Sequence, residues 1–447
     1  MREALIVIFL AVSAMVTLRW PFYGVLCIVV TAVLRDTMVV ETYKAWFHFH
    51  GYEVLYIATL FGLFISRSDL LPKMYPRTAV DWGMMGFLLV LVISGLANGV
   101  NVWSHKYIDL FFKATVLYFL LSRLADTPRK ATLAGVAMVL ATTYLTYLAW
   151  SKYRAGQLTY ARPYLISSYH DFGLQLSITL PMIGALLAKR MALPVRVFLL
   201  GLVPLYVLVA LRTHSRSAYL GIGVGLAMLA WYHRRRLHYV VLALPLVAYA
   251  VAHNPDVVSK RLRSIWTHET PGGYEDRSIQ SRFEQMKTAL RIIQANPLLG
   301  IGPRQFFRQY DRWAGEEYTG ATYTMHNVTL LIMSEEGLMG LFCYYLLLTL
   351  GVLREAAFVS QMTRGDPRLE ATGIVGAGAA MGFIAFCAYG LGQPQMWVVN
   401  IYIAVALVTA SRFVVEAHLQ AQEATEPAPQ RATPALAGGG TTEVVFS

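Results

Sequence analysis

Four arginines in or beside the loops of this chain are the residues best suited to chemistry: Arg212, Arg216, Arg282 and Arg304. A guanidinium group can donate two parallel hydrogen bonds to a phosphate, and such contacts stabilise charge that develops on a phosphate leaving group. Arg282 opens an expected helix over residues 281–295, where free backbone N–H groups would add to anion binding. These residues predict a site for a phosphate-bearing substrate.

A general base is the second requirement for transfer to a hydroxyl group. His326 precedes Asn327 at the start of an apolar run, and histidine suits proton transfer near neutral pH. Nearby arginines should lower the pKa of this imidazole and keep it neutral. We therefore expect His326 to be the catalytic base. Supporting candidates for the same site are His170, His214, Asn327, Glu335 and Glu336.

Each of these residues also has an ordinary structural explanation. An arginine at the end of a membrane span, such as Arg212, commonly reaches lipid phosphates. Arg282 could form a surface salt bridge with Asp276 or Glu284, and His326 could cap its own helix. These alternatives stay open at the level of the sequence.

Glu335 and Glu336 first suggest carboxyl groups inside a membrane, which would be costly and indicative of function. A single helix over residues 326–353 would, however, be about 42 Å long, whereas the hydrocarbon core is roughly 30 Å thick. The first turns of this helix should therefore rise above the hydrocarbon. We expect the two carboxyl groups near the interface and leave their role open.

The elements that must position these residues are transmembrane helices. The chain has 447 residues, of which 56% are hydrophobic and 14% charged, with a mean hydropathy of +0.48, whereas soluble domains carry roughly 25% charged residues. Its apolar runs are continuous rather than alternating, which favours helices over a barrel. The expected spans are 3–18, 22–39, 51–66, 80–97, 107–122, 131–150, 171–189, 196–211, 217–232, 237–252, 326–353, 371–390 and 396–412.

The positions of basic residues predict the orientation. Short loops rich in Lys and Arg stay in the cytoplasm. Five such loops alternate along the chain: Arg67/Lys73/Arg77, Arg123/Arg129/Lys130, Lys189/Arg190/Arg196, Arg234/Arg235/Arg236 and Arg354/Arg364/Arg368. The formal net charge of +12 is then largely an orientation signal, and nucleic-acid binding is not needed to explain it. The outer side receives residues 98–106, 151–170, 212–216, 253–325 and 391–395.

We expect an all-α, polytopic transmembrane bundle of about 12 spans, because residues 1–40 should cross once, with a break at Trp20-Pro21. Its expected parts are an N-terminal bundle (1–252), a periplasmic lid loop (253–325), C-terminal transmembrane helices (326–412) and a cytoplasmic, largely disordered tail (413–447).

Within the lid, residues 281–295 read as an amphipathic helix that ends at Asn296-Pro297. Ser281 and Glu284 form a capping-box pattern at its start. Its apolar stripe consists of Phe283, Met286, Leu290 and Ile293.

Metal and disulfide chemistry are not expected. Cys27, Cys343 and Cys387 all lie in apolar runs, where cysteine behaves as a small hydrophobic residue. The sequence contains no Cys/His pattern with metal-ligand spacing, and the outer side has no acidic cluster suited to Mg²⁺. We predict an activity without metal or cofactor, in which arginine takes the place of a cation.

Three ordered motifs resemble the O-antigen ligase and polymerase superfamily. They are His214-Ser215-Arg216-Ser217-Ala218-Tyr219-Leu220-Gly221, then Arg282 heading a helix that ends at Asn296-Pro297-Leu298-Leu299-Gly300-Ile301-Gly302, and then His326-Asn327 followed by Glu336-Gly337-Leu338-Met339-Gly340-Leu341. Together they cover residues 165–355. His170-Asp171-Phe172-Gly173 and His214-Ser215-Arg216 also resemble the ligase branch associated with exosortase systems. Ser217 departs from the glycine that is most common at its position.

The resemblance implies a multi-pass glycosyltransferase of the bacterial inner membrane with its active site facing the periplasm. Such ligases take a glycan from undecaprenyl diphosphate and attach it to a sugar hydroxyl of lipid A–core, without a metal or a nucleotide sugar. The catalytic residues would be His326, Arg216 and Arg282, and Arg212 and Arg304 would join the two arginines in binding the diphosphate. Direct displacement at the anomeric carbon would invert its configuration.

Other activities fit parts of the same pattern. An O-antigen or capsule polymerase would share the donor and the arginines but join lipid-linked repeat units, and a protein O-glycosylation ligase would use a protein acceptor. A transporter of lipid-linked sugars would show internal repeats and charges near mid-membrane, whereas the charges here gather at one face.

Overall fold

The computed structural model describes residues 2–34, 51–69, 74–99, 101–156, 168–232, 277–315 and 324–425, which form helices and connecting turns without any strand. The all-helical prediction is therefore confirmed for these residues. The expected span 237–252, the first part of the lid loop (253–276) and the end of the tail (426–447) lie outside them. Six described helices are long and apolar enough to cross a membrane: Ala79–Ala97, Pro128–Arg154, Leu193–Arg212, Gly337–Met362, Glu370–Gly390 and Val399–Ala424.

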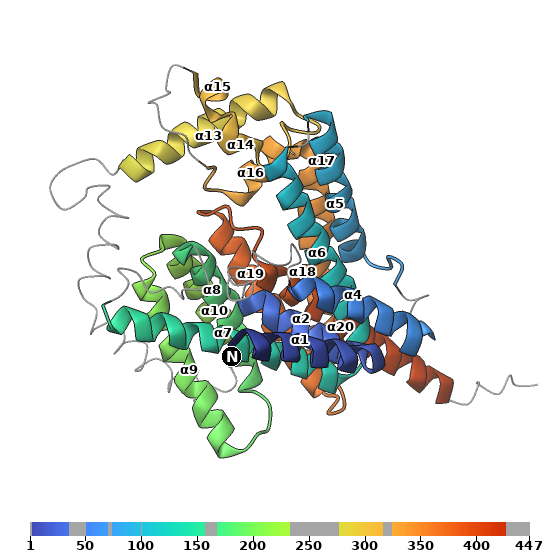
Figure 1. The fold of residues 1–447 in the computed structure, drawn as a ribbon. Helices are drawn as coiled ribbons and strands as arrows, with labels where there is room; N and C mark the ends of the chain where they lie inside the picture. The colour runs from blue at the N-terminus through green and yellow to red at the C-terminus, as the bar shows by residue number, and fades with distance from the viewer. Residues whose placement is uncertain are drawn as a thin grey trace, which may run out of the picture.

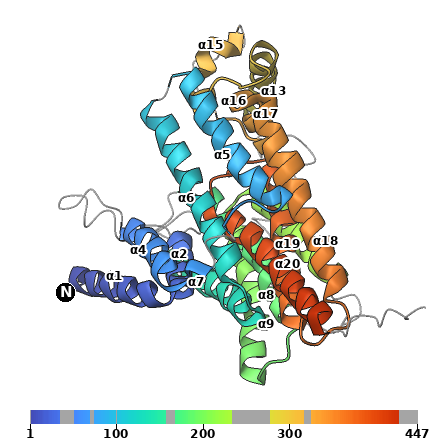
Figure 2. The same cartoon turned by 90° about the vertical axis from the view of Figure 1, so that its right-hand side faces the viewer.

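The described elements are α1 (Arg2–Arg19), α2 (Pro21–Leu34), α4 (Gly51–Ser66), α5 (Ala79–Ala97), α6 (Val102–Leu124), α7 (Pro128–Arg154), α8 (Tyr169–Leu186), α9 (Leu193–Arg212), α10 (Arg216–Tyr232), α13 (Arg277–Ala295), α14 (Gln305–Arg308), α15 (Tyr310–Ala314), α16 (Val328–Glu335), α17 (Gly337–Leu341), η3 (Phe342–Thr349), α18 (Leu350–Met362), α19 (Glu370–Gly390) and α20 (Val399–Thr425). Helices α13 to α16 gather at one end of the bundle, beside α17 (Figure 1). Below them, α8, α10 and α19 pack together. Turning the view shows α5, α6 and α18 running side by side towards the same end (Figure 2).

The core is centred on α8, α19 and α20. Every residue from Phe172 to Leu186 is buried, as expected for a helix that is apolar on all sides. Small residues allow α8 to approach its neighbours closely. A Cβ atom on Gly221 of α10 would lie 2.9 Å from Ser177 Oγ, and one on Gly382 of α19 would lie 2.5 Å from the Ile178 carbonyl oxygen. Helices α10 and α19 therefore cannot shift on α8 without clashes.

The first two helices form a hairpin. A Cβ atom on Gly24, early in α2, would lie 2.3 Å from Thr17 Cγ2, late in α1. Residues seven apart in one straight helix are about 10 Å apart along its axis, so the chain reverses at Trp20. The predicted break at Trp20-Pro21 is confirmed, and a single crossing by residues 1–40 stays a prediction. Ser66 at the end of α4 donates a hydrogen bond to the Leu18 carbonyl (2.7 Å) and joins the hairpin to α4.

The expectation of a single helix over residues 326–353 is wrong. Helix α16 ends at Glu335, and Gly337 takes a left-handed backbone conformation with φ of 68°. A Cβ atom there would lie 2.3 Å from the Leu298 carbonyl oxygen, so only glycine fits. The candidate membrane span begins after this break, at Gly337. Glu335 and Glu336 thus precede the span, and both are buried in protein rather than placed at a water interface.

Helix α13 is longer than expected and packs through a different face. It begins at Arg277, so Ser281 does not cap it and Arg282 lies in the second turn, beyond the free N–H groups. Anion binding by the helix N-terminus therefore cannot involve Arg282 as expected. The buried face is formed by Gln285, Thr288, Ala289 and Ile292, while Phe283, Met286 and Leu290 of the expected packing stripe are exposed. The predicted end at Ala295, before Asn296-Pro297, is confirmed.

A buried ion pair joins α5 and α6 at the end of the bundle away from the lid. Asp81 completes the capping box of α5, where its Oδ2 accepts the backbone N–H groups of Arg77 (2.8 Å) and Thr78 (2.9 Å). Its Oδ1 accepts Tyr118 Oη–H (2.7 Å) and Arg123 Nη2–H (2.8 Å). The Arg123 guanidinium also lies over the Phe413 ring of α20, 4.4 Å from its centroid. One carboxylate thus holds three helices in register.

Asp81→Ala should strongly destabilise the protein. The Asp81 side chain is fully buried and that of Arg123 is 3% exposed, and removal of one partner of a buried pair typically costs about 3–5 kcal/mol. We expect a clearly lower melting temperature for the purified protein in detergent, measured by intrinsic fluorescence. Asp69→Ala is the matched control, because the Asp69 side chain is 62% exposed in its pair with Arg67. Equal melting of the two variants would contradict this role for Asp81.

The predicted orientation can be tested at two exposed arginines, Arg308 in α14 and Arg129 at the start of α7. In a background without Cys27, Cys343 and Cys387, Arg308→Cys should react with an impermeant maleimide in intact spheroplasts of a bacterial host. Arg129→Cys should react only after permeabilisation, because its basic loop is expected in the cytoplasm. The opposite labelling pattern would place the lid in the cytoplasm.

Candidate active site

The tight turn between α9 and α10 presents Arg216 at the start of a helix. Thr213 follows the last residue of α9, His214 takes a left-handed conformation with φ of 56°, and Ser215 Oγ accepts the backbone N–H of Ala218 (3.4 Å). Ser215 is thus the N-cap of α10. The chain reverses within three residues, and Arg216 is the first residue of the new helix.

The second motif forms a joint with the third. Backbone hydrogen bonds connect the turn after α13 with the break after α16: Ile301 N–H to the Ser334 carbonyl (3.0 Å), Gly302 N–H to the Glu335 carbonyl (2.9 Å) and Leu338 N–H to the Pro297 carbonyl (2.8 Å). A Cβ atom on Gly300 would lie 2.4 Å from the Glu335 carbonyl carbon. We call residues 296–304 and 334–339 the lid joint.

Glu335 is a structural residue of the lid joint. Its two carboxylate oxygens accept the backbone N–H groups of Arg304 (2.8 Å) and Phe306 (3.0 Å), which holds the left-handed Arg304 in place. The Arg304 guanidinium lies over the Tyr107 ring of α6, 4.8 Å from its centroid. Glu336 is fully buried, and its carboxylate has no hydrogen-bond partner among the described residues. Glu335 and the backbone of Arg304 are therefore part of the lid joint.

His326 is held by the short loop between α19 and α20. Its Nδ1 lies 3.2 Å from Gln393 Oε1. An amide oxygen can only accept, so Nδ1 carries the proton and Nε2 keeps its lone pair. Asn327 caps α16 by accepting the Leu330 N–H (3.0 Å) and donates to the Leu391 carbonyl (3.3 Å). Asn327 thus fixes the backbone beside His326, and Gln393 fixes the ring.

Arg282 meets the same loop from the lid. A Cβ atom on Gly392 would lie 3.8 Å from Arg282 Nη1 and 2.5 Å from Ser217 Oγ. Both atoms therefore lie near the place that a side chain at position 392 would occupy, so the guanidinium of Arg282 is close to the first turn of α10. Because Gln393 is the next residue, Arg282, His326 and the start of α10 meet around one loop.

His170 completes this group from α8. Its Nδ1 lies 3.1 Å from Ser215 Oγ, and its carbonyl accepts a hydrogen bond from Tyr389 Oη–H (2.8 Å). Ser168 caps α8 and so fixes the backbone at His170. The N-cap of α10 is thus tied to the first turn of α8.

The three titratable groups of the site influence one another. Both histidines lie outside the candidate membrane spans. Burial lowers the pKa of His326 below its ordinary value, the charge of Arg282 lowers it further, and the hydrogen bond that His326 donates to Gln393 opposes this shift. Burial also lowers the pKa of His170, to about 4, together with the charges of His326 and Arg282. Both imidazoles are therefore neutral at pH 7, beside a permanent cation.

A neutral imidazole with a free Nε2 can accept a proton, and the guanidinium beside it can bind an anion. The structure thus brings together Arg282, His326 and His170, with Arg216 on the turn that contacts them. Arg212 Nη1 donates to Tyr153 Oη at 2.9 Å, and Arg304 lies at the lid joint. In the described part of the chain, no group of three or more His, Cys, Asp or Glu side chains could hold a metal ion.

Several residues of this site were not identified from the sequence. Gln393 and Gly392 lie in the short connection 391–395, which we expected on the outer side without assigning it a role. A polar residue between a glycine and a proline in such a short loop was the available signal. In the sequence, Ser215 and Ser217 were part of the first motif, but no role was assigned to them. Their contacts with His170 and Gly392 depend on helix packing.

Comparison with known proteins identifies one family. The model of the O-antigen ligase family matches residues 198–345, from α9 to η3. The matched region contains Arg216, Arg282 and His326, whereas His170 and Gln393 lie outside it. No curated protein matches the chain. The match at residues 198–345 supports the O-antigen ligase superfamily for this part of the chain.

Proposed function

We propose that this protein is an O-antigen ligase. It transfers a glycan from undecaprenyl diphosphate to a sugar hydroxyl of lipid A–core, at the periplasmic face of the bacterial inner membrane. The observation that carries the proposal is the meeting of Arg282 and His326 at Gly392-Gln393. An anion-binding group and an oriented base then lie within one buried site.

In the proposed reaction the acceptor hydroxyl oxygen attacks the anomeric carbon of the donor glycan. The bond between this carbon and the diphosphate oxygen breaks, and its electron pair leaves with undecaprenyl diphosphate. The hydroxyl proton passes to Nε2 of His326, whose Nδ1–H remains on Gln393. Attack opposite the leaving group inverts the anomeric configuration.

The leaving group gains negative charge during this step, and a guanidinium stabilises it best in a site with little water. Arg282 is the cation that lies beside His326, and Arg216 is one residue from both Ser215 and Ser217. We assign donor binding to these two arginines. Arg212 and Arg304, with their guanidinium groups over Tyr153 and Tyr107, have supporting roles in the protein framework. The proposed transfer uses no metal.

A polymerase of lipid-linked repeat units is the second candidate, because the family match fits ligases and polymerases alike. Both reactions need the same donor, the same arginines and the same base. A ligase and a polymerase differ only in the acceptor of the glycan. A protein O-glycosylation ligase also differs from both in its acceptor, which is a protein. A transporter would need none of the base chemistry at His326.

The decisive experiment supplies the purified protein, in liposomes, with lipid-linked glycan and lipid A–core. We expect a glycan joined to lipid A–core. A longer lipid-linked polymer would instead identify a polymerase, a glycosylated protein would identify a protein ligase, and movement of the donor without a new bond would identify a transporter.

In the same assay, His326→Gln should lower turnover by about 10²–10⁴-fold, the usual contribution of general base catalysis, while binding of the lipid-linked donor is retained. Gln393→Leu should lower turnover less, because the imidazole remains but loses the hydrogen bond that orients it and raises its pKa. His418→Gln is the control, since His418 pairs with Asp366 (3.1 Å) near the end of α20. A loss smaller than tenfold in His326→Gln would argue against a catalytic base at this position.

The pH–rate profile tests the coupling between Arg282 and His326. Activity should fall as the pH drops through the lowered pKa of His326, because the protonated ring cannot accept a proton. Arg282→Gln removes a charge that lowers this pKa, so the acid limb should move to higher pH. Arg282→Lys keeps the charge and should leave the limb near its original position.

Arg282→Gln and Arg282→Lys should also each lose about tenfold to a hundredfold in kcat/KM. Glutamine lacks the charge, and lysine cannot make the planar two-point contact with the diphosphate. If Arg282→Gln kept the acid limb of the unmodified protein, the titrating group would have to lie away from Arg282.

A further inference from the structure

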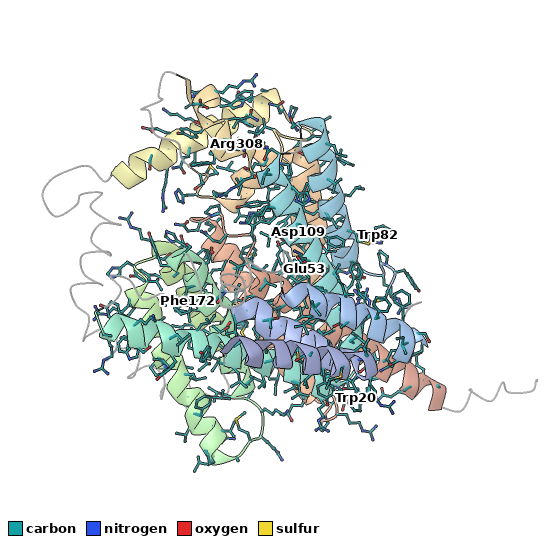
Figure 3. The ribbon with its side chains drawn as sticks, in the orientation of Figure 1. Trp20, Glu53, Trp82, Asp109, Phe172 and Arg308 are labelled. Atoms are coloured by element: carbon teal, nitrogen blue, oxygen red, sulfur yellow. The ribbon has the colours of Figure 1, made fainter. Side chains whose placement is uncertain are left out.

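A second site for an anion lies at the end of the molecule opposite the lid. The labelled Trp20 lies at the bottom of the view and the labelled Arg308 of α14 at the top (Figure 3). A pocket of about 290 Å³ opens beside Trp20, where the α1–α2 turn meets the ends of α4 and α6 and the start of α7. Its lining residues are Arg19, Trp20, Pro21, Phe22, Tyr23, Arg67, Leu124, Thr127, Arg129, Lys130 and Leu133.

The lining of this pocket contains four cationic side chains and no carboxylate. Two of the cations already have partners outside the lining: Arg67 pairs with Asp69 (3.1 Å) and Asp126 (3.4 Å), and Lys130 pairs with Asp126 (2.6 Å). Arg19 and Arg129 form no ion pair with the described residues. The Lys130 ammonium also lies 5.5 Å from the centroid of the Phe22 ring, on the pocket wall. The pocket therefore holds positive charge that the described residues do not balance.

The surroundings of the pocket are apolar. Large hydrophobic side chains are exposed around it. Leu133 of α7 belongs to the lining, and Leu18 of α1 and Phe64 and Ile65 of α4 lie within three residues of the lining residues Arg19 and Arg67 in the sequence. Trp20 and Tyr23 are each about half exposed at its mouth, as is common for aromatic residues at a membrane interface. A ligand of this pocket should therefore combine an anionic group with apolar chains.

We propose that this pocket binds the phosphodiester headgroup of an anionic phospholipid, with the acyl chains lying along α1, α4 and α7. Basic pockets between membrane helices recognise such headgroups. A zwitterionic lipid fits less well, because its ammonium group would meet four cations. A soluble phosphate would satisfy the charge but not the exposed apolar faces. Since the pocket and the transferase site lie at opposite ends, the proposal does not depend on the proposed function.

The bound lipid would join three elements of the fold. Arg19 belongs to the N-terminal hairpin, Arg67 follows α4, and Arg129 and Lys130 open α7. One phosphodiester held between these side chains would bring the hairpin, α4 and α7 together at a single membrane depth.

The test is lipid binding to the purified full-length protein in neutral detergent, measured by native mass spectrometry with phosphatidylglycerol and phosphatidylethanolamine. The double variant Arg19→Gln/Arg129→Gln removes the two cations without ion pairs. Its affinity for phosphatidylglycerol should fall by about tenfold or more, since each surface cation contributes appreciably to anionic lipid binding.

Arg308→Gln/Arg312→Gln is the matched control. Arg312 lies over the neighbouring Trp313 ring at 5.9 Å, as Arg19 lies over Trp20 at 5.8 Å, but both control residues lie on the lid. This control should bind phosphatidylglycerol as the unmodified protein does, and phosphatidylethanolamine and inorganic phosphate should not displace the bound lipid.

Unchanged phosphatidylglycerol binding in Arg19→Gln/Arg129→Gln, at an unchanged melting temperature without lipid, would overturn the proposal. Equal binding of phosphatidylethanolamine would overturn the charge selectivity. Displacement by inorganic phosphate at low concentration would show a site for soluble anions instead.

Discussion

The lid joint is the contact on which the arrangement of the candidate site depends. Residues 296–304 and 334–339 share backbone hydrogen bonds, and the Glu335 carboxylate closes the turn at Arg304 and Phe306. This joint fixes the end of α13 relative to α16, and α16 begins directly after His326 and Asn327. The position of Arg282 over His326 therefore follows from contacts that neither residue makes. Such backbone contacts leave no room for side chains, which explains the glycines at 300 and 337.

The other half of the site depends on the packing of α8, α10 and α19. Close contacts through Gly221 and Gly382 set these helices against one another. They bring His170, Ser215 and the loop after α19 to the same end of the bundle. The site thus forms where the lid meets the bundle, and burial there lowers the pKa of both histidines. The positions of the two histidines and their lowered proton affinity consequently have the same origin, the exclusion of water where the lid packs on the bundle.

Polar side chains gather at two distant places in this apolar protein. At one end, Arg282 and the histidines form the candidate transferase site; at the other, Arg19, Arg67, Arg129 and Lys130 line a pocket whose lining has no carboxylate. At the end of the bundle away from the lid, the buried pair of Asp81 and Arg123 is satisfied within the protein. An unbalanced cation is costly to retain in a membrane protein, and an anionic lipid would offset that cost at the pocket.

By itself, the sequence determined the helical class and the approximate ends of most described helices. It also determined the three motifs that carry Arg216, Arg282 and His326. Both follow from neighbouring residues, because the length of an apolar run and the spacing within a motif are local properties. It misjudged the face of α13, the start of that helix and the continuity of residues 326–353, because these depend on what packs against them. Only the tertiary structure decided that Gln393, 67 residues further along the chain, orients His326, and that Glu335 supports the lid. Such long-range contacts leave no periodic signal in a chain, since they arise when distant helices meet.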